Sequence, residues 1–228
     1  MSNNIYVGWD SREDIAYQVC EHSIRRRTNQ NSVNVSPLKQ SELREQKLYW
    51  REQDKLSSTE FTITRFLVPH LNKFTGWAAF CDCDMVWRSD PSELFSQIDD
   101  SKAVMVVKHD YTPQEGTKMD GQLQMLYPRK NWSSMILWNC GHPKNKALDL
   151  ETVNTASPSF LHRFEWLDDE DIGTLDHSWN WLVGWYDVER DGDPKIIHYT
   201  EGGPWFEETR HCEFGHIWKQ ELINLYSS

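Results

Sequence analysis

Asp82 and Asp84, two aspartates one residue apart, are the side chains whose types and spacing most directly suggest chemistry. They follow an apolar run at residues 77–80. In an extended segment the side chains at positions i and i+2 point the same way, so both carboxylates should lie on one face, with Cys81 and Cys83 on the other. Two like charges about 4 Å apart repel by roughly 4 kcal/mol at an effective dielectric constant of about 20. A divalent cation would relieve this repulsion, and oxygen ligands favour Mg²⁺ or Mn²⁺.

The competing interpretation of the aspartate pair is a strand that ends in a polar turn with solvated carboxylates. Two further residues bear on the choice, because Asp10 follows an apolar run at residues 5–9 and His198 lies in another at residues 196–200. Open α/β sheets bind ligands at the carboxyl ends of their strands, where these groups are expected on one sheet. A nucleoside diphosphate held through a metal would explain them all, with Asp10 accepting hydrogen bonds from the base or ribose and His198 joining the metal ligands. A lone histidine at a strand end is more often structural.

Other residues could complete such a site. The glycine pair at residues 202–203 would let backbone N–H groups approach phosphate, although Gly-Gly-Pro is first of all a turn signal. Arg12 and Arg65 could contact diphosphate oxygens, or each could form an ordinary surface salt bridge. Asp168 and Asp169 could orient a sugar hydroxyl or stabilise a cationic transition state, whereas a solvated acidic helix end is the simpler interpretation.

The elements that must position these groups alternate between strands and helices at the start of the chain. Residues 5–9 predict a strand, and apolar residues at helical spacing from residue 15 onward predict a helix, with Ser11 and Asp14 as a capping box. Residues 32–35 predict a second strand. This βαβ opening indicates an α/β fold with a mostly parallel central sheet flanked by helices.

Later segments continue the alternation. The sequence predicts a helix over residues 58–67 that ends near Pro69, and an irregular polar segment at 36–58 that we expect to help select an acceptor together with 110–130. Asp90 and Ser157, each followed by proline, predict helix starts. The remaining expected strands are 77–81, 103–107, 135–138 and 196–200, and the remaining expected helix is 216–226.

Composition limits the partners and the compartment. The 228-residue chain carries 24 Lys and Arg against 35 Asp and Glu, for a formal net charge of −11, which disfavours nucleic acid as a partner. No apolar run reaches membrane-spanning length and the N-terminus lacks a basic and apolar signal, so we expect no membrane span and a cytoplasmic location. The five cysteines are odd in number and form no C-x-x-C pair, which indicates reduced core thiols.

Together these motifs resemble the retaining GT-A glycosyltransferases of the glycogenin and bacterial lipopolysaccharide glucosyl- and galactosyltransferase type, glycosyltransferase family 8. Residues 5–10, Ile-Tyr-Val-Gly-Trp-Asp, resemble their uridine-binding first strand, and Arg65 resembles the helix arginine near their donor sugar. Asp82-Cys83-Asp84 matches their DxD metal motif. Residues 198–205 resemble their late motif of histidine, glycines and Pro-Trp, whose histidine is the third protein ligand of Mn²⁺.

The resemblance implies a single GT-A, Rossmann-like domain over residues 1–228 that uses Mn²⁺ or Mg²⁺. It implies transfer of a hexose from a UDP-sugar, with UDP-glucose as the first choice, to a glycan or other hydroxyl acceptor with retention of the anomeric configuration. The implied metal ligands are Asp82, Asp84 and His198. The implied donor-binding residues are Gly8, Trp9, Asp10, Arg12, Arg65, Asp82, Cys83, Gly202, Gly203 and Trp205. The implied catalytic residues are Asp168, Asp169 and Arg65.

The chain departs from the family pattern at two places. Its late motif lacks the lysine that usually precedes Pro-Trp and contacts diphosphate, which shifts weight to Arg65, Arg12 and backbone amides. The family's Asp-Gln pair near the donor sugar is replaced by Asp168-Asp169. Two alternatives stay open: an inverting GT-A transferase in which Asp168 or Asp169 is the general base, and a non-catalytic nucleotide-sugar or glycan-binding protein.

Overall fold

The structure is a computed structural model that describes residues 3–28, 33–52, 59–109 and 129–227. Its centre is a six-stranded sheet with the strand order β2-β1-β3-β6-β5-β7. The strands are β1 (Asn3–Gly8), β2 (Val33–Leu38), β3 (Trp77–Cys81), β5 (Val104–Val107), β6 (Met135–Asn139) and β7 (Ile172–Leu175). β1 pairs in parallel with β2 and β3, and β5 with β7, whereas β6 runs antiparallel to β3 and β5. The expected α/β fold with a mostly parallel sheet is confirmed, and its single reversed strand is new.

The central strands are apolar and buried because both faces of the sheet are covered. β5 and β6 are buried at every position, as is β3 after its first residue. Continuous apolar runs are typical of strands that lie between two layers of helices. These buried strands therefore fix the positions at which the loops at their ends begin.

A smaller sheet of three strands has the order β4-β9-β8. It consists of β4 (Met85–Trp87), β8 (Trp181–Leu182) and β9 (Ile196–His198). β4 pairs antiparallel with β9, with Met85 opposite His198. The expectation that His198 shares a sheet with Asp10 and the aspartate pair is therefore wrong. The ladder nevertheless brings His198 next to Asp84, because β4 begins directly after Asp84.

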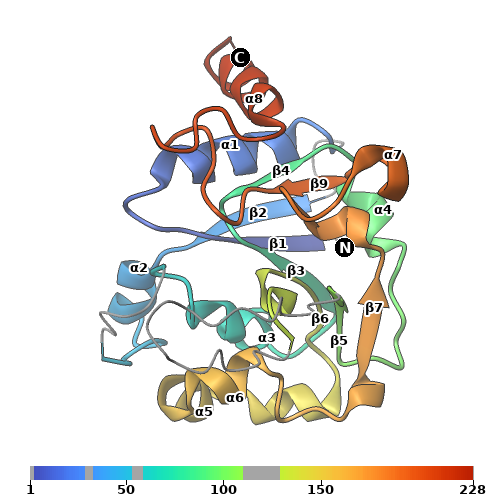
Figure 1. The fold of residues 1–228 in the computed structure, drawn as a ribbon. Helices are drawn as coiled ribbons and strands as arrows, with labels where there is room; N and C mark the ends of the chain where they lie inside the picture. Colours follow the sequence, from blue (N-terminus) through green and yellow to red (C-terminus); the bar gives the residue numbers. More distant parts are fainter. Residues whose placement is uncertain (1–2, 29–32, 53–58, 110–128, 228) are drawn as a thin grey trace, which may run out of the picture.

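Helices cover both sides of the strands. Figure 1 shows α1 and α8 together above the strands, with α3, α5 and α6 below them. The α-helices are α1 (Asp14–Arg25), α2 (Gln40–Glu45), α3 (Val68–Leu71), α4 (Pro91–Phe95), α5 (Leu150–Thr155), α6 (Pro158–His162), α7 (Val188–Asp191) and α8 (Gly215–Ser227). The 3₁₀ helices are η1 (Thr64–Leu67), η2 (Trp132–Ser134), η3 (Pro143–Ala147), η4 (Asp169–Asp171) and η5 (His177–Asn180). The extent of one domain over residues 1–228 stays a prediction.

The expected helix starts hold at two of three places. Asp90 accepts a hydrogen bond from the Ser92 N–H at 2.8 Å, and Ser157 caps α6 in the same manner. The capping box at the start of α1 is wrong, because the N-cap position is Glu13 and no side chain caps it. The Ser11 hydroxyl instead donates to the Glu60 carboxylate, which ties the loop after β1 to a segment 49 residues away.

The segment around Pro69 differs from the sequence prediction. Residues 59–63 form turns, η1 follows, and Pro69 lies in the first turn of α3 rather than at a helix end. Proline is tolerated there because the first N–H groups of a helix have no partner within it. The segment 36–58 was expected to be irregular, but it contains the end of β2 and all of α2. Its residues 53–58, and 110–128 of the second expected acceptor loop, lie outside the described residues.

The last helix is fixed to the first by a buried charge. Glu221 of α8 accepts hydrogen bonds from Arg26 and Arg27 and lies 2.8 Å from Nδ1 of His22. In the part of the chain that the structure describes, none of the helices combines the length and apolar character needed to cross a bilayer. Helices α1 and α8 thus lie together on the upper side in Figure 1, away from α5 and α6.

Candidate metal centre

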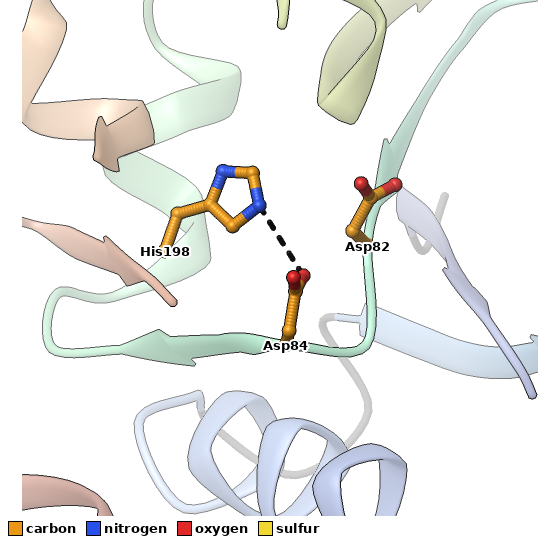
Figure 2. Close-up of side chains that lie close together, drawn as sticks. All are labelled: Asp82, Asp84 and His198. Carbon is orange, nitrogen blue, oxygen red and sulfur yellow. Dashed lines mark ion pairs between the residues drawn. The ribbon is translucent and has the colours of Figure 1, made fainter. Parts of the chain in front are cut away.

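Asp82, Asp84 and His198 converge on one point. Figure 2 shows the three side chains facing one another from the end of β3, the turn before β4 and the end of β9. One possible ligand atom from each lies within 4.8 Å of the others. Cys81 and Cys83 are buried while the two aspartates are partly exposed, so the expected alternation of this segment is confirmed.

Backbone hydrogen bonds hold the two aspartates in place. The Asp82 N–H donates to the carbonyl of Ser134 at 3.0 Å, which extends the antiparallel pairing of β3 and β6 by one residue. The carbonyl of Asp84 accepts from the Tyr199 N–H at 3.0 Å, directly after His198. Each carboxylate therefore starts from a backbone position fixed by a different sheet.

The electrostatics of the cluster fit a bound cation. Oδ1 of Asp82 and Oδ1 of Asp84 are buried and accept no well-directed hydrogen bond from described residues. The nearest charged atoms are Arg65 Nη1, 2.9 Å from the first oxygen, and His198 Nε2, 3.3 Å from the second. Burial, opposed by Arg65 and reinforced by Asp84, raises the pKa of Asp82 to about 7. Two carboxylates and one imidazole are a donor set that Mn²⁺ or Mg²⁺ can use, so the residues fit the metal.

His198 is buried between the two aspartates and a polar network. Burial alone would lower the pKa of this imidazole, but Asp84 and Asp82 outweigh burial and raise the pKa above its ordinary value. A metal binds an imidazole through the lone pair of a ring nitrogen, so a proton and a metal compete for that nitrogen. Metal binding therefore depends on which ring nitrogen of His198 carries hydrogen.

A cavity of about 920 Å³ opens over the cluster. Its volume is within the range of pockets that hold small organic ligands. The predicted site residues in its wall are Arg65, Asp82, Asp84, His198 and Gly202. Arg129 and Lys130 also line it, as do Glu13, Glu201 and Glu208.

Arg65 is held rigidly in the wall of the cavity. Its Nη1 donates to the carbonyl of Ser133 at 2.7 Å and its Nε donates to the carbonyl of Thr62 at 3.1 Å. The guanidinium group lies over the rings of Phe61 and Phe80, 5.3 and 4.9 Å from their centroids. Cation–π contacts of this kind are stronger when the cation is withdrawn from water. The arginine is thus fixed beside Asp82 before any ligand enters.

Asp10 and Arg12 bind each other at the end of β1. Asp10 is fully buried, and its carboxylate accepts from Nε and Nη2 of Arg12 and from the N–H groups of Arg12 and Glu60. Burial alone would raise the pKa of Asp10, but these hydrogen bonds lower it. Neighbouring Trp9 donates from Nε1 to Asp14 at 2.7 Å, and Gly8 lies against Phe61. These residues shape the loop beside the cavity.

Part of the late motif also lines the cavity. Gly202 has φ +102°, in the region that favours glycine, and lines the cavity. A Cβ on Gly203 would lie 1.8 Å from the ring of Trp205, so only glycine fits there. Trp205 donates from Nε1 to Glu13 at 3.2 Å. Burial, reinforced by Asp84 and Asp10, raises the pKa of Glu13 to about 7.

Asp168 and Asp169 lie outside the lining residues of this cavity. Lys144 Nζ lies 2.7 Å from Asp168, and Arg129 forms an ion pair with Asp169. The side chains of both aspartates are largely exposed. Asp169 is thus linked to the cavity through Arg129, which is one of its lining residues.

Sequence reasoning missed the cationic wall formed by Arg129 and Lys130. Both residues precede β6, and because β6 is reversed its beginning lies at the edge where the parallel strands end. Arg129 and Asn131 also adopt positive φ angles of +62°, a backbone conformation rare for residues other than glycine. The direction of β6 was the missing information. Glu13 had a signal, because it lies in the acidic segment directly after the first strand.

Sequence comparison finds Protein CDI of Arabidopsis thaliana, which is 55% identical over 221 residues. The match covers 96% of this chain and 85% of Protein CDI, whose name states no activity. No protein-family model matches the chain.

Comparison with solved structures finds glycosyltransferases. GlyE of Streptococcus pneumoniae TIGR4 has a TM-score of 0.62 at 15% identity, covering 98% of this chain and 60% of GlyE. The bifunctional glycosyltransferase WbbM has 0.59 at 16%, covering 99% and 51%. The galactosyltransferase LgtC, solved with donor and acceptor sugar analogs, has 0.58 at 12%, covering 97% and 95%. The chain spans less than two thirds of GlyE and WbbM, and these likenesses establish a GT-A fold alone.

Proposed function

This chain belongs to the family of Protein CDI of Arabidopsis thaliana, and from its GT-A fold and its acidic cluster we propose that it is a metal-dependent glycosyltransferase. The proposed reaction moves a hexose from a UDP-sugar to a hydroxyl group of a glycan or other acceptor. We take UDP-glucose as the donor and retention of anomeric configuration as the outcome. Both choices rest on the sequence resemblance to family 8.

The observation that supports the proposal most is the position of the three possible ligands. One possible ligand atom from each of Asp82, Asp84 and His198 lies within 4.8 Å of the others in the wall of a cavity of about 920 Å³. Two of their oxygens are buried and accept no well-directed hydrogen bond from the described residues. Buried acceptors normally have partners. A cation at this point would supply them.

A bound Mn²⁺ or Mg²⁺ would supply a Lewis acid that offsets negative charge on the departing UDP. The chain itself provides further positive charge for the diphosphate. Arg65 is fixed beside Asp82, and Arg129 and Lys130 line the same cavity. We assign to Arg129 and Lys130 the positive charge that the missing lysine of the late motif would otherwise contribute. Gly202 lines the same cavity, and its N–H already donates to the carbonyl of Tyr199 at 2.8 Å.

The roles of the remaining predicted residues follow from their positions. Asp10 and Arg12, which already bind each other, would shape the uridine end of the site together with Gly8, Trp9 and Trp205. Asp168 and Asp169 stay proposed catalytic residues, held by Lys144 and by Arg129. Arg65 is the proposed catalytic residue that the cavity wall itself contains. A cytoplasmic location is part of the proposal and rests on the five cysteines, all of which are free.

The first test measures release of UDP. The protein is incubated with UDP-glucose and Mn²⁺, with and without EDTA, and with a panel of acceptor sugars. We expect UDP release that EDTA abolishes and that an acceptor increases. Absence of metal-dependent release with every common UDP-sugar would contradict the enzyme and favour the alternative of a non-catalytic nucleotide-sugar or glycan-binding protein.

The second test concerns stereochemistry. The anomeric proton of the product, observed by NMR as it forms, should show the configuration of the donor sugar. An inverted product would favour the inverting alternative, which needs a carboxylate as general base. Asp168→Asn and Asp169→Asn would then show which of the two carboxylates is required.

A further inference from the structure

Asn180, the last residue of η5, contacts the ring nitrogen of His198 that does not face Asp84. It is fully buried, and its Oδ1 lies 2.8 Å from Nδ1 of His198. On its other side, Nδ2 lies 2.9 Å from the hydroxyl of Ser134, 3.3 Å from the carbonyl of Asn131 and 3.0 Å from Nε2 of His109. The amide is thus surrounded by polar groups on both sides.

These neighbours fix which way the amide points. The carbonyl of Asn131 can only accept hydrogen bonds, so the atom beside it must be the NH₂ group of Asn180. The Ser134 hydroxyl donates its own hydrogen to the same carbonyl at 2.7 Å, which leaves its oxygen to accept from Asn180. Two independent contacts therefore direct Nδ2 away from His198 and Oδ1 toward it.

A carbonyl oxygen facing Nδ1 requires hydrogen on Nδ1. We infer that Asn180 is a positioning residue that holds the neutral ring of His198 with its hydrogen on Nδ1, so that the lone pair of Nε2 faces Asp84 and Asp82. In metal sites the partner of the second ring nitrogen commonly sets the tautomer in this way. The part of the inference that concerns a metal rests on the proposed function.

The network behind Asn180 supports this arrangement. Nε2 of His109 accepts from Asn180, so Nδ1 of His109 donates to the hydroxyl of Tyr186, 2.7 Å away. Burial, together with the nearby rings of His198 and His177, lowers the pKa of His109 to about 3, so this ring is neutral and can accept. The chain of contacts runs from Asp84 through His198, Asn180 and His109 to Tyr186.

The deciding measurement reads the tautomer without any metal. Long-range ¹H–¹⁵N NMR of the metal-free protein, at a pH where the His198 ring is neutral, should show a protonated Nδ1 and an unprotonated Nε2. In Asn180→Leu the hydrogen should move to Nε2, because the Asp84 carboxylate 3.3 Å away then offers the better acceptor. Asn180→Asp keeps an acceptor for Nδ1–H and should retain the wild-type tautomer.

Binding of Mn²⁺ supplies a second readout. Asn180→Leu should weaken Mn²⁺ binding by about 10- to 100-fold, the usual effect of losing such a partner, and Asn180→Asp should bind as tightly as wild type or more tightly. The matched control is Asn145→Leu, which removes another fully buried asparagine with three hydrogen bonds at the far end of β6. It should lose stability but keep Mn²⁺ affinity.

Three results would overturn the inference. One is hydrogen on Nε2 of His198 in the wild type. This measurement does not depend on whether any variant folds. Another is an unchanged tautomer in Asn180→Leu, and the third is an equal loss of Mn²⁺ affinity in Asn180→Leu and Asn145→Leu. If the wild type bound no Mn²⁺, the proposed metal would be wrong, and the NMR result would still decide the role of Asn180.

Discussion

At the scale of single residues, Asp82 and Asp84 each place a buried carboxylate oxygen where it accepts no well-directed hydrogen bond from the described residues. Arg65 offsets part of the charge on Asp82, yet the pKa of that carboxyl is raised to about 7 because burial outweighs it. Residues arranged for a ligand commonly destabilise the protein that lacks the ligand. The pair is therefore expected to weaken the metal-free fold.

Asp84→Asn tests this expectation. The variant removes one of two facing charges and keeps the shape of the side chain, so Mn²⁺ binding measured by calorimetry should fall below detection. The free energy of unfolding without metal should stay constant or rise by about 1 kcal/mol, because loss of the contact between Asp84 and His198 offsets most of the roughly 4 kcal/mol of repulsion between the carboxylates. Asp193→Asn removes an exposed carboxylate and serves as the control, which should bind Mn²⁺ normally. Unchanged Mn²⁺ affinity in Asp84→Asn would remove Asp84 from the metal site.

His198→Ala is the companion variant. It removes one ligand without removing negative charge, so Mn²⁺ affinity should fall less than in Asp84→Asn. Calorimetry of both variants under the same conditions gives the order directly. A larger loss in His198→Ala than in Asp84→Asn would contradict the proposed division of roles.

At the scale of elements, the end of β1 and the segment before η1 depend on each other. A Cβ on Gly8 would lie 2.4 Å from the ring of Phe61, and the Phe61 ring supports the guanidinium group of Arg65. The absence of a side chain at Gly8 therefore lets a segment 53 residues later approach the first strand. This approach brings Arg65 to the cavity.

Gly8→Ala should disturb this contact. Overpacking of a core commonly costs about 1–3 kcal/mol, so the free energy of unfolding in urea should fall by that amount. Binding of UDP with Mn²⁺ should weaken as well, because Arg65 moves with Phe61. Gly141→Ala is the control, since the nearest atoms to its Cβ would be 3.5 Å away or more. Equal effects of the two substitutions would mean that Gly8 has no special contact.

At the scale of the whole molecule, buried neutral histidines tie stability to pH. The pKa of His109 is lowered to about 3 by burial and the nearby histidines, whereas its ordinary value is 6.5. Between these values the unfolded chain takes up a proton that the folded protein does not. Unfolding is therefore favoured as pH falls below 6.5, and His109 adds nothing to the pH dependence above that value.

The corresponding prediction compares unfolding free energies across pH. Wild type should lose stability relative to His109→Gln by up to about 1.4 kcal/mol for each pH unit below 6.5. Denaturation in urea is measured at several pH values from about 4 to about 8, on both sides of the ordinary histidine pKa. The measurements give the slope of the unfolding free energy against pH for each protein. Parallel curves for wild type and His109→Gln would show that His109 titrates alike in both states.

Local chemistry of the chain was enough for much of the fold. Alternating apolar runs and helix signals such as Asp90-Pro91 predicted the α/β class, because hydrophobic period and capping are local properties. The prediction of a helix end near Pro69 was wrong because it also used only local signals. Proline is compatible both with the end of a helix and with its first turn. A local pattern cannot choose between these two.

The sequence by itself determined the types of the metal-site residues and the order in which they occur. The spacing of Asp82 and Asp84 set their common direction through the geometry of an extended chain, and the late histidine was recognised from its motif. Only the tertiary structure decided that His198 comes from a second sheet, that the reversed β6 brings Arg129 to the cavity, and that Asn180 lies behind the site. Strand direction and register depend on contacts between residues far apart in the chain, and no local pattern encodes them.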